Sequence, residues 1–263
     1  MRLRLRFWRP RPVIVLELHG TLAARVGALN IAAYGRLIEA AAAAAGEGGT
    51  LLLDVESPGG SPVQSDLIAS RIRRLADEKK LRVVAVIGEV GASGGYWLAC
   101  AADEIVANPM SVVGSIGVIG GGFGLGAALS RLGVQRRLYT AGKNKARLDP
   151  FSPEKPDDVA FVRALMADLH ERFKSWVRAR RPGKLPADEE AVFDGGWMLG
   201  ERAVAMGLAD RLGDLDSEVR RIGGPKARAL VFRPRRRGLL GRLPRLMAEA
   251  AVEAMEVASR PRV

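Results

Sequence analysis

The sequence predicts an α/β fold built on a mostly parallel β-sheet. Short apolar runs with the length of buried strands, 13–16, 50–53 and 83–87, alternate with segments of helical periodicity at 28–45 and 61–75. This alternation is typical of parallel βα units, in which helices cover both faces of the sheet. Ligands of such folds gather at the carboxyl ends of the strands, so we expect the site there.

The charge distribution divides the 263 residues into three parts. The net charge of +12 comes from the ends: residues 1–12 carry five arginines, and residues 225–263 carry ten basic residues against three glutamates. Residues 13–224 are neutral overall. We therefore expect a basic N-terminal arm (1–12), a globular domain (13–224) and a basic tail (225–263). Such termini suit an anionic membrane surface or nucleic acid, or serve only as solubilising tails.

We expect neither a signal peptide nor a membrane span in this chain. The first twelve residues lack an apolar stretch of signal-peptide length. The uncharged segment 105–130 is long enough to span a bilayer, but it holds Pro109 and seven glycines, and we interpret it as buried strand and loop. The remaining elements are expected as a strand at 104–107, a helix at 123–132, a strand at 134–140, a long helix at 157–181 and a short helix at 201–206.

A serine flanked by glycines follows the third apolar run, in Gly91-Ala92-Ser93-Gly94-Gly95. Glycines permit a sharp strand-to-helix turn, and the free N–H groups of a helix start can meet an oxyanion. Ser93 is therefore a candidate nucleophile, although a tight βα turn with a capping serine has the same pattern. A second turn of this kind, Ser57-Pro58-Gly59-Gly60-Ser61, follows the second run.

Few side chains could activate such a serine. The two histidines are His19, at the end of the first strand, and His170, inside the long helix. The other candidates are Lys143 and Lys145, since a lysine acts as a base where burial or nearby positive charge favours its neutral form. Cys100, the single cysteine, is expected to be a buried structural thiol.

These residues together resemble a known family. Ser57-Pro58-Gly59-Gly60, the Ser93 motif continuing as Tyr96-Trp97, Gly114-Ser115-Ile116-Gly117-Val118, the GxxK of 142–145 and Gly207-Leu208-Ala209-Asp210 occur in the order and spacing of the signal peptide peptidases of the SppA/SohB type. Those proteins are Ser-Lys peptidases on the ClpP/crotonase fold. The resemblance covers residues 13–223 and implies repeated ββα units, with a C-terminal helical tail added here.

The resemblance implies a role for each matching residue. Ser93 would be the nucleophile, Lys145 the general base, and Ser115 the residue that orients the lysine. The N–H groups of Gly60 and Gly94 would form the oxyanion hole, with Gly59 shaping the turn. We favour Lys145 over Lys143 because the family's lysine stands third after the glycine, here Gly142. The implied enzyme is an ATP-independent serine endopeptidase that acts on peptides through an acyl-enzyme.

Partners follow from the same resemblance. In short family members the serine and the lysine come from neighbouring subunits of a ring, so we expect a homo-oligomer. We expect the chain to lack the family's usual N-terminal anchor and to be cytoplasmic, with peripheral contact at the inner membrane as one option. Apolar residues recur at helical spacing over 239–258, which indicates an amphipathic helix for a membrane surface or another subunit. No nucleic acid is expected.

Two alternatives stay open. A His-dependent α/β-hydrolase-type esterase would use His170, and a catalytically silent crotonase-fold scaffold would only bind peptides or membrane partners. Residues 122–127 also fit a loose dinucleotide-binding pattern, but no acidic residue follows at the distance that a ribose contact needs. We therefore expect no cofactor. With two histidines and one cysteine, we expect no metal.

Overall fold

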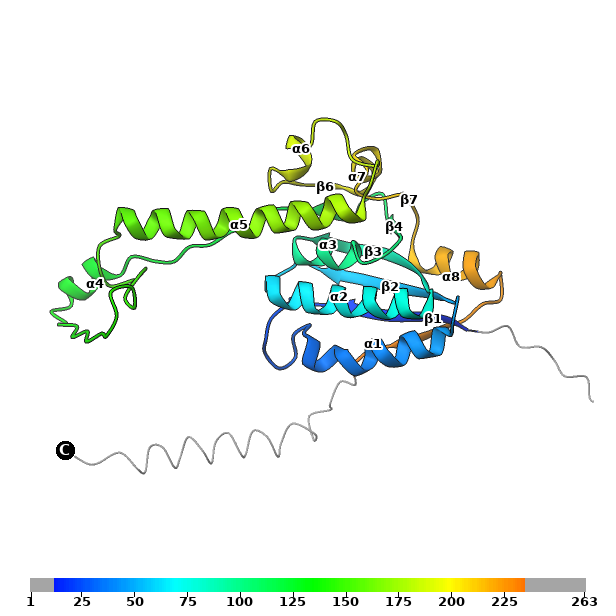
Figure 1. The fold of residues 1–263 in the computed structure, drawn as a ribbon, viewed down its shortest axis with the longest axis horizontal. Coiled ribbons are helices and arrows are strands. Elements are labelled where there is room, and N and C mark those ends of the chain that lie inside the picture. Colours follow the sequence, from blue (N-terminus) through cyan, green and yellow to red (C-terminus); the bar gives the residue numbers. More distant parts are fainter. Residues whose placement is uncertain (1–11, 235–263) are drawn as a thin grey trace, which may run out of the picture. The chain divides into compact units, whose positions relative to one another are not determined.

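The computed structural model of the chain describes residues 12–234. Within this range the strands form one eight-stranded sheet (Figure 1). The strands are β1 (Val13–His19), β2 (Thr50–Ser57), β3 (Arg82–Ala92), β4 (Glu104–Ala107), β5 (Val112–Gly114), β6 (Trp197–Leu199), β7 (Arg211–Leu212) and β8 (Ala229–Phe232). Their order is β6-β5-β3-β2-β1-β8, and β4 pairs with β3 and β7. All pairs are parallel except β5 with β6, which confirms the predicted α/β class.

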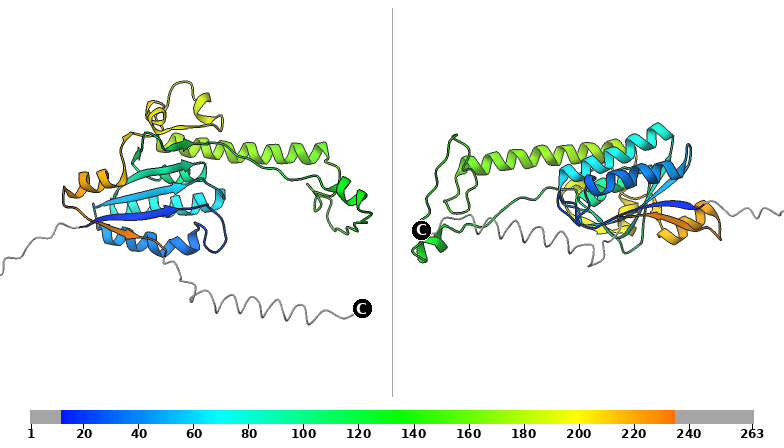
Figure 2. Two further views of the ribbon diagram at one scale, coloured as in Figure 1. Left: turned by 180° about the vertical axis from the view of Figure 1, so that it is seen from behind. Right: turned by 90° about the horizontal axis from the view of Figure 1, so that it is seen from below.

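Helices cover both faces of this sheet. Those described are α1 (Ile31–Ala45), α2 (Pro62–Lys79), α3 (Gly94–Ala99), α4 (Gly126–Arg131), α5 (Pro156–Arg180), α6 (Glu190–Phe193), α7 (Gly200–Ala205) and α8 (Leu215–Gly223). Helices α1, α2 and α3 pack on one face, and α8 packs on the other (Figures 1 and 2). The connections of β1, β2 and β3 therefore run through helices, as parallel neighbours require.

The alternation of side chains along each strand builds two cores. On β1 and β2, Leu16 and Leu53 face the large core beneath α1 and α2, while Val15 and Leu52 face the smaller core beneath α8. All four side chains are fully buried. Because both faces of the sheet are buried, these strands read as unbroken apolar runs in the sequence rather than as alternating patterns.

Helix α5 is docked on the sheet domain by its carboxyl-terminal part. The Trp97 ring of α3 lies 5.1 Å from Phe173 and 5.7 Å from Trp176 between ring centroids, and Trp176 Nε1 donates to the Trp97 carbonyl at 3.0 Å. The rest of α5 extends away from the sheet (Figure 1). Residues 117–170, which we call the arm, comprise this extended part of α5, helix α4 and the segments around α4.

The arm differs from the sequence prediction. Residues 134–140, expected as a strand, form no regular element, and their side chains are exposed. Residues 119–125, expected in a buried strand and loop, are also exposed, with Ile119 97% accessible. The apolar and glycine content of residues 105–130 predicts burial, but residues 119–125 pair with no strand in the described part of the chain.

The other end of the sheet also differs. The predicted domain stops at residue 224, whereas β8 continues the sheet by pairing in parallel with β1 from Val13↔Ala229 to Leu16↔Phe232. The strand is short and basic residues flank it, so the hydrophobic pattern of the sequence does not identify it. The predicted N-terminal basic segment up to residue 11 and the helix over 239–258 lie outside the described residues. Between residues 12 and 234, no helix has both the length and the apolar character to cross a membrane.

A buried hydroxyl on α3 allows a test of the packing beside the site. Tyr96 is fully buried, and its hydroxyl donates to the carbonyl of Leu208 at 2.8 Å. Tyr96→Phe should lower the free energy of unfolding by about 1 kcal/mol, because the Leu208 carbonyl stays buried without its donor. Urea denaturation measures this. Tyr139→Phe is the matched control, since Tyr139 is 88% exposed; equal effects of the two changes would contradict the assignment.

Candidate active site

Ser93 lies at the turn between β3 and α3, as the sequence predicts for its motif. Its backbone has φ 52° and ψ −122°, a positive φ that is strained for a residue with a side chain. The conformation is held because the Ser93 N–H donates to the Gly114 carbonyl at 2.8 Å and the Ser93 carbonyl accepts from Trp97 N at 3.0 Å. Ser93 is half-buried. The strain fits a nucleophile elbow, which exposes its hydroxyl at the top of the sheet.

Ser115 is brought beside Ser93 by strand pairing. Strands β3 and β5 are paired up to Ala92↔Gly114, so the two serines follow directly on paired positions. Ser115 also has a positive φ, 53°, and its N–H donates to the Gly196 carbonyl at 2.6 Å. The two serines therefore leave neighbouring strands at the same edge of the sheet, each through a strained turn.

The glycine turn after β2 contacts the Ser93 elbow. A Cβ atom on Gly59 would lie 2.7 Å from Ser93 Cβ and 2.7 Å from the Gly94 nitrogen, which is closer than non-bonded carbon atoms approach. Gly59 and Gly60 also have φ angles of 98° and 136°, where a side chain is unfavourable. Only glycine at 59 allows the two turns to meet.

The predicted oxyanion donors belong to these two turns. Gly94 is the first residue of α3, and the N–H groups in the first turn of a helix have no partner within the helix. Gly60 is exposed and adjoins Gly59, which touches Gly94. Ser93, Ser115, Gly60 and Gly94 are thus gathered at one end of the sheet, which is the end where parallel α/β folds bind ligands.

Lys145 is not brought to this cluster within one chain. It is exposed and lies in the segment between α4 and α5, at the end of α5 remote from α3 (Figure 1). That segment is tied to the start of α5 by the Leu148 N–H, which donates to Asp158 Oδ2 at 3.4 Å. Asp158 precedes Trp176, the contact with α3, by a helix length of about 27 Å at 1.5 Å per residue. Lys143, the rival base, is exposed in the same segment.

The other candidate groups have structural roles. His170 Nε2 donates to the Ile116 carbonyl at 2.9 Å and so ties α5 to the chain after Ser115. This contact gives no support to His170 as a base. Cys100 is fully buried, and burial raises the pKa of its thiol to about 12, as expected of a structural cysteine.

A carboxylate–imidazole cluster lies at the ends of β1 and β2. His19 Nε2 is 2.9 Å from Asp54 Oδ2, and its Nδ1 is 3.7 Å from Glu17 Oε1. One ligand atom from each residue lies within 4.8 Å of the others, so these side chains could also hold a cation. The hydrogen bond with Asp54 raises the pKa of His19 above its usual value, because the carboxylate stabilises the protonated ring.

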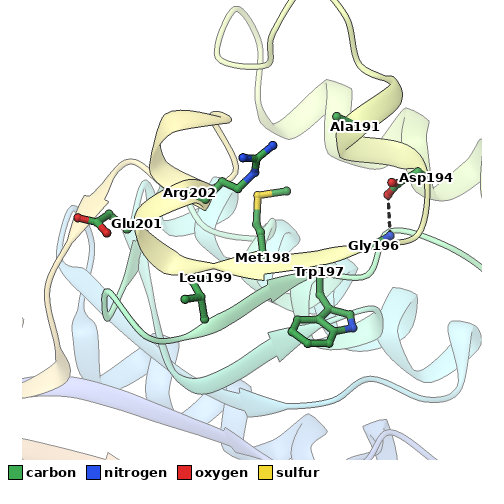
Figure 3. Close-up of a pocket in the computed structure, with 8 residues that line it drawn as sticks. All are labelled: Ala191, Asp194, Gly196, Trp197, Met198, Leu199, Glu201 and Arg202. Carbon is green, nitrogen blue, oxygen red and sulfur yellow. Dashed lines mark hydrogen bonds between the residues drawn. The ribbon is translucent and has the colours of Figure 1, made fainter.

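An open depression of about 430 Å³ lies over β6, lined by residues of α6, β6 and α7 (Figure 3). Trp197 and Leu199 point to one side of the strand and Met198 to the other, as alternation along a strand requires. Asp194 Oδ1 accepts the N–H of Gly196 at 2.6 Å. Neither Ser93 nor Lys145 lines this depression.

Comparison with known proteins agrees with this geometry. Residues 75–226 match the family model described as Peptidase family S49, and the chain belongs to that family. "Probable protease SohB" of Buchnera aphidicola (Acyrthosiphon pisum) is 34% identical over 170 residues, which are 63% of this chain and 48% of that protein. The solved structure of a mutant "1510-N membrane-bound stomatin-specific protease" has a TM-score of 0.51 at 13% identity, covering 86% of this chain and 99% of that one. This last likeness supports the fold, which is of the ClpP/crotonase type.

A further relative carries a different name. "Na(+)/H(+) antiporter NhaA" of Brucella abortus (strain 2308) is 46% identical over 209 residues, which are 79% of this chain but 28% of that protein. The chain thus spans between about a quarter and a half of the length of these two curated relatives. The antiporter name describes the whole Brucella protein, most of which has no counterpart here.

The residues that hold the two turns have no recognisable signal in the sequence. The Gly114 carbonyl that fixes the Ser93 turn is a backbone group, so no sequence motif identifies it. Leu22 and Ser65, which lie against Gly94, belong to a loop and a helix and are part of no motif. These residues are tens of positions from Gly94 in the sequence, so their contact with it can be recognised only in the folded structure.

The His19 cluster gives a pH-dependent prediction. The folded pKa of His19 lies above its unfolded value of about 6.5, so the interaction stabilises the fold below that pH and is lost as the pH rises through the folded pKa. The free energy of unfolding of wild type minus that of His19→Gln should be largest near pH 5 and should shrink at alkaline pH. Urea titrations at several pH values test this. A difference that grows with pH would contradict it.

Proposed function

We propose that the chain is a serine endopeptidase in which Ser93 is the nucleophile and Lys145 of a neighbouring subunit is the general base. The observation that carries the proposal is the contact between the Gly59 turn and the strained Ser93 elbow. That contact joins a hydroxyl to two backbone donors at the ligand-binding end of the sheet. Membership of peptidase family S49 supports the reaction class and favours it over an esterase that uses His170.

In the proposed reaction, Ser93 Oγ attacks the scissile carbonyl carbon while its proton passes to the neutral amine of Lys145. The carbonyl oxygen becomes an oxyanion and accepts hydrogen bonds from Gly60 N–H and Gly94 N–H. The C–N bond then breaks, and the ammonium of Lys145 returns the proton to the leaving amine. Water, deprotonated by Lys145, hydrolyses the acyl-enzyme and regenerates Ser93.

The lysine needs an enclosed environment for this role, because removal from water favours a neutral amine. Within one chain Lys145 is exposed, at the end of α5 remote from α3, so a second subunit would have to enclose it. The arm offers surface for such a contact, because exposed apolar side chains that gather in one region mark interaction sites. Its apolar side chains more than 50% exposed are Ile119, Phe123, Leu132, Val134 and Tyr139. Ser115, beside Ser93, would then meet the incoming amine and orient it.

The substrate class that fits is an extended peptide, taken from unfolded or membrane-released polypeptides, with no ATP requirement and no cofactor. We place the enzyme in the cytoplasm, with peripheral membrane contact through its basic termini as an option. A vesicle flotation assay would test that contact. The substrates and activities that the names of the relatives suggest are not assigned to this chain, because the chain covers only part of those proteins.

Removal of either dyad residue should abolish turnover. Ser93→Ala and Lys145→Ala should each lower kcat on a fluorogenic peptide by at least about 10³-fold, because neither group acts without the other. Lys143→Ala is the matched control, two residues from Lys145 in the same exposed segment, and should keep nearly full activity. Activity retained in Lys145→Ala but lost in Lys143→Ala would transfer the role of base to Lys143.

Mixing the inactive variants tests whether the dyad is shared. If Ser93 and Lys145 of one site come from two chains, co-assembled Ser93→Ala and Lys145→Ala subunits regain about a quarter of wild-type activity, since one pairing in four is complete. Mass measurement by light scattering verifies co-assembly. Mixed oligomers that stay inactive would contradict a shared dyad.

A further inference from the structure

We infer that Leu22 is a positioning residue for the oxyanion hole, setting the relative placement of its two backbone donors. The inference rests on the proposed function, in which Gly60 N–H and Gly94 N–H receive the developing charge. Leu22 lies in the loop after β1, and its atoms lie close to the positions that a Cβ would take on each of the two glycines. It contributes to the hole without touching substrate.

The backbone of Leu22 holds the Gly60 side of the hole. Leu22 N–H donates to the Gly59 carbonyl at 2.9 Å, and the Leu22 carbonyl accepts from Ser61 N–H at 2.8 Å. These two bonds form a parallel bridge opposite Gly60. In a parallel bridge of this kind, the residues before and after Gly60 make the hydrogen bonds to Leu22. The N–H of Gly60 itself therefore points away from Leu22.

The side chain of Leu22 holds the Gly94 side of the hole. Leu22 is 1% exposed, and its Cδ1 lies 2.8 Å from the position a Cβ of Gly94 would take. Ser65 Oγ also stands against this position, and it donates to the Ser61 carbonyl at 3.0 Å. The start of α3 thus packs against Leu22 and Ser65, both of which also bond to the turn that contains Gly60.

Leu22 is itself fixed by the loop that carries it. Leu29, also 1% exposed, donates its N–H to the Thr21 carbonyl at 3.1 Å and accepts from Ala23 N–H at 3.2 Å. These bonds flank Leu22 on both sides, so its position does not depend on bound substrate. Donors fixed in advance need no reorganisation when charge develops, and this is the property that makes oxyanion holes effective.

Truncation of Leu22 should therefore impair the transition state more than substrate binding. Leu22→Ala opens a space beside Gly94, and misplaced donors should lower kcat about 10- to 100-fold while KM changes by less than about threefold. A peptide aldehyde, whose adduct with Ser93 places an oxygen in the hole, should bind Leu22→Ala more weakly by a factor similar to the loss in kcat/KM. Leu22→Met, which keeps a long apolar side chain, should stay within about threefold of wild type.

Leu51→Ala is the matched control. Leu51 is also 1% exposed in the same core, but it lies at the start of β2, at the opposite end of that strand from the Gly59 turn. The control should lose stability yet keep its kcat and its affinity for the aldehyde. If Leu22→Ala does not fold, Leu22→Val provides the smaller truncation, with a loss in kcat of at least about threefold.

The outcomes separate this inference from the proposed function. An oxyanion-specific loss in the Leu22 variants, with rescue by Leu22→Met, supports it. A kcat within twofold of wild type, or equal losses in the Leu22 and Leu51 variants, overturns it while the dyad stands. Full activity in Ser93→Ala would instead overturn the proposed function.

Discussion

The contact between the Gly59 turn and the Ser93 elbow is the constraint on which the site depends. It requires that β2 and β3 lie side by side and that their carboxyl ends meet at one edge. It also requires that residue 59 carry no side chain, since a Cβ there would overlap Ser93. The packed sheet and the helices beneath it supply the rigidity with which two strained turns can be kept together. The core therefore serves the chemistry by fixing backbone positions.

The residues of the proposed dyad lie in two different regions of the chain. The sheet domain carries Ser93, Ser115 and the backbone donors, whereas the arm carries Lys145. The separation is maintained by α5, whose carboxyl-terminal part is docked on the sheet domain through contacts that include Trp97, Phe173 and Trp176. On the account proposed here, activity would be linked to assembly, because a lone chain would lack a base beside its nucleophile.

Much of the sheet domain could be predicted because its signals are local. The runs that became β1, β2 and β3 are apolar enough to identify buried strands, and the glycine motifs mark the turns after them. The arm could not be predicted in this way. Val134–Thr140 has the composition of a strand, yet a strand needs a partner, and composition does not reveal whether one is present. The bridge from Leu22 to Gly60 spans 38 residues and has no local pattern.

If Ser93 is the nucleophile, it forms a covalent acyl intermediate, which intact-mass spectrometry can detect after reaction with an activated peptide ester. We expect one acyl group per chain, mapped by proteolysis to the peptide that contains Ser93 and absent from Ser93→Ala. An acyl group mapped to Ser115 or Cys100, or turnover of the ester by Ser93→Ala at the wild-type rate, would contradict it.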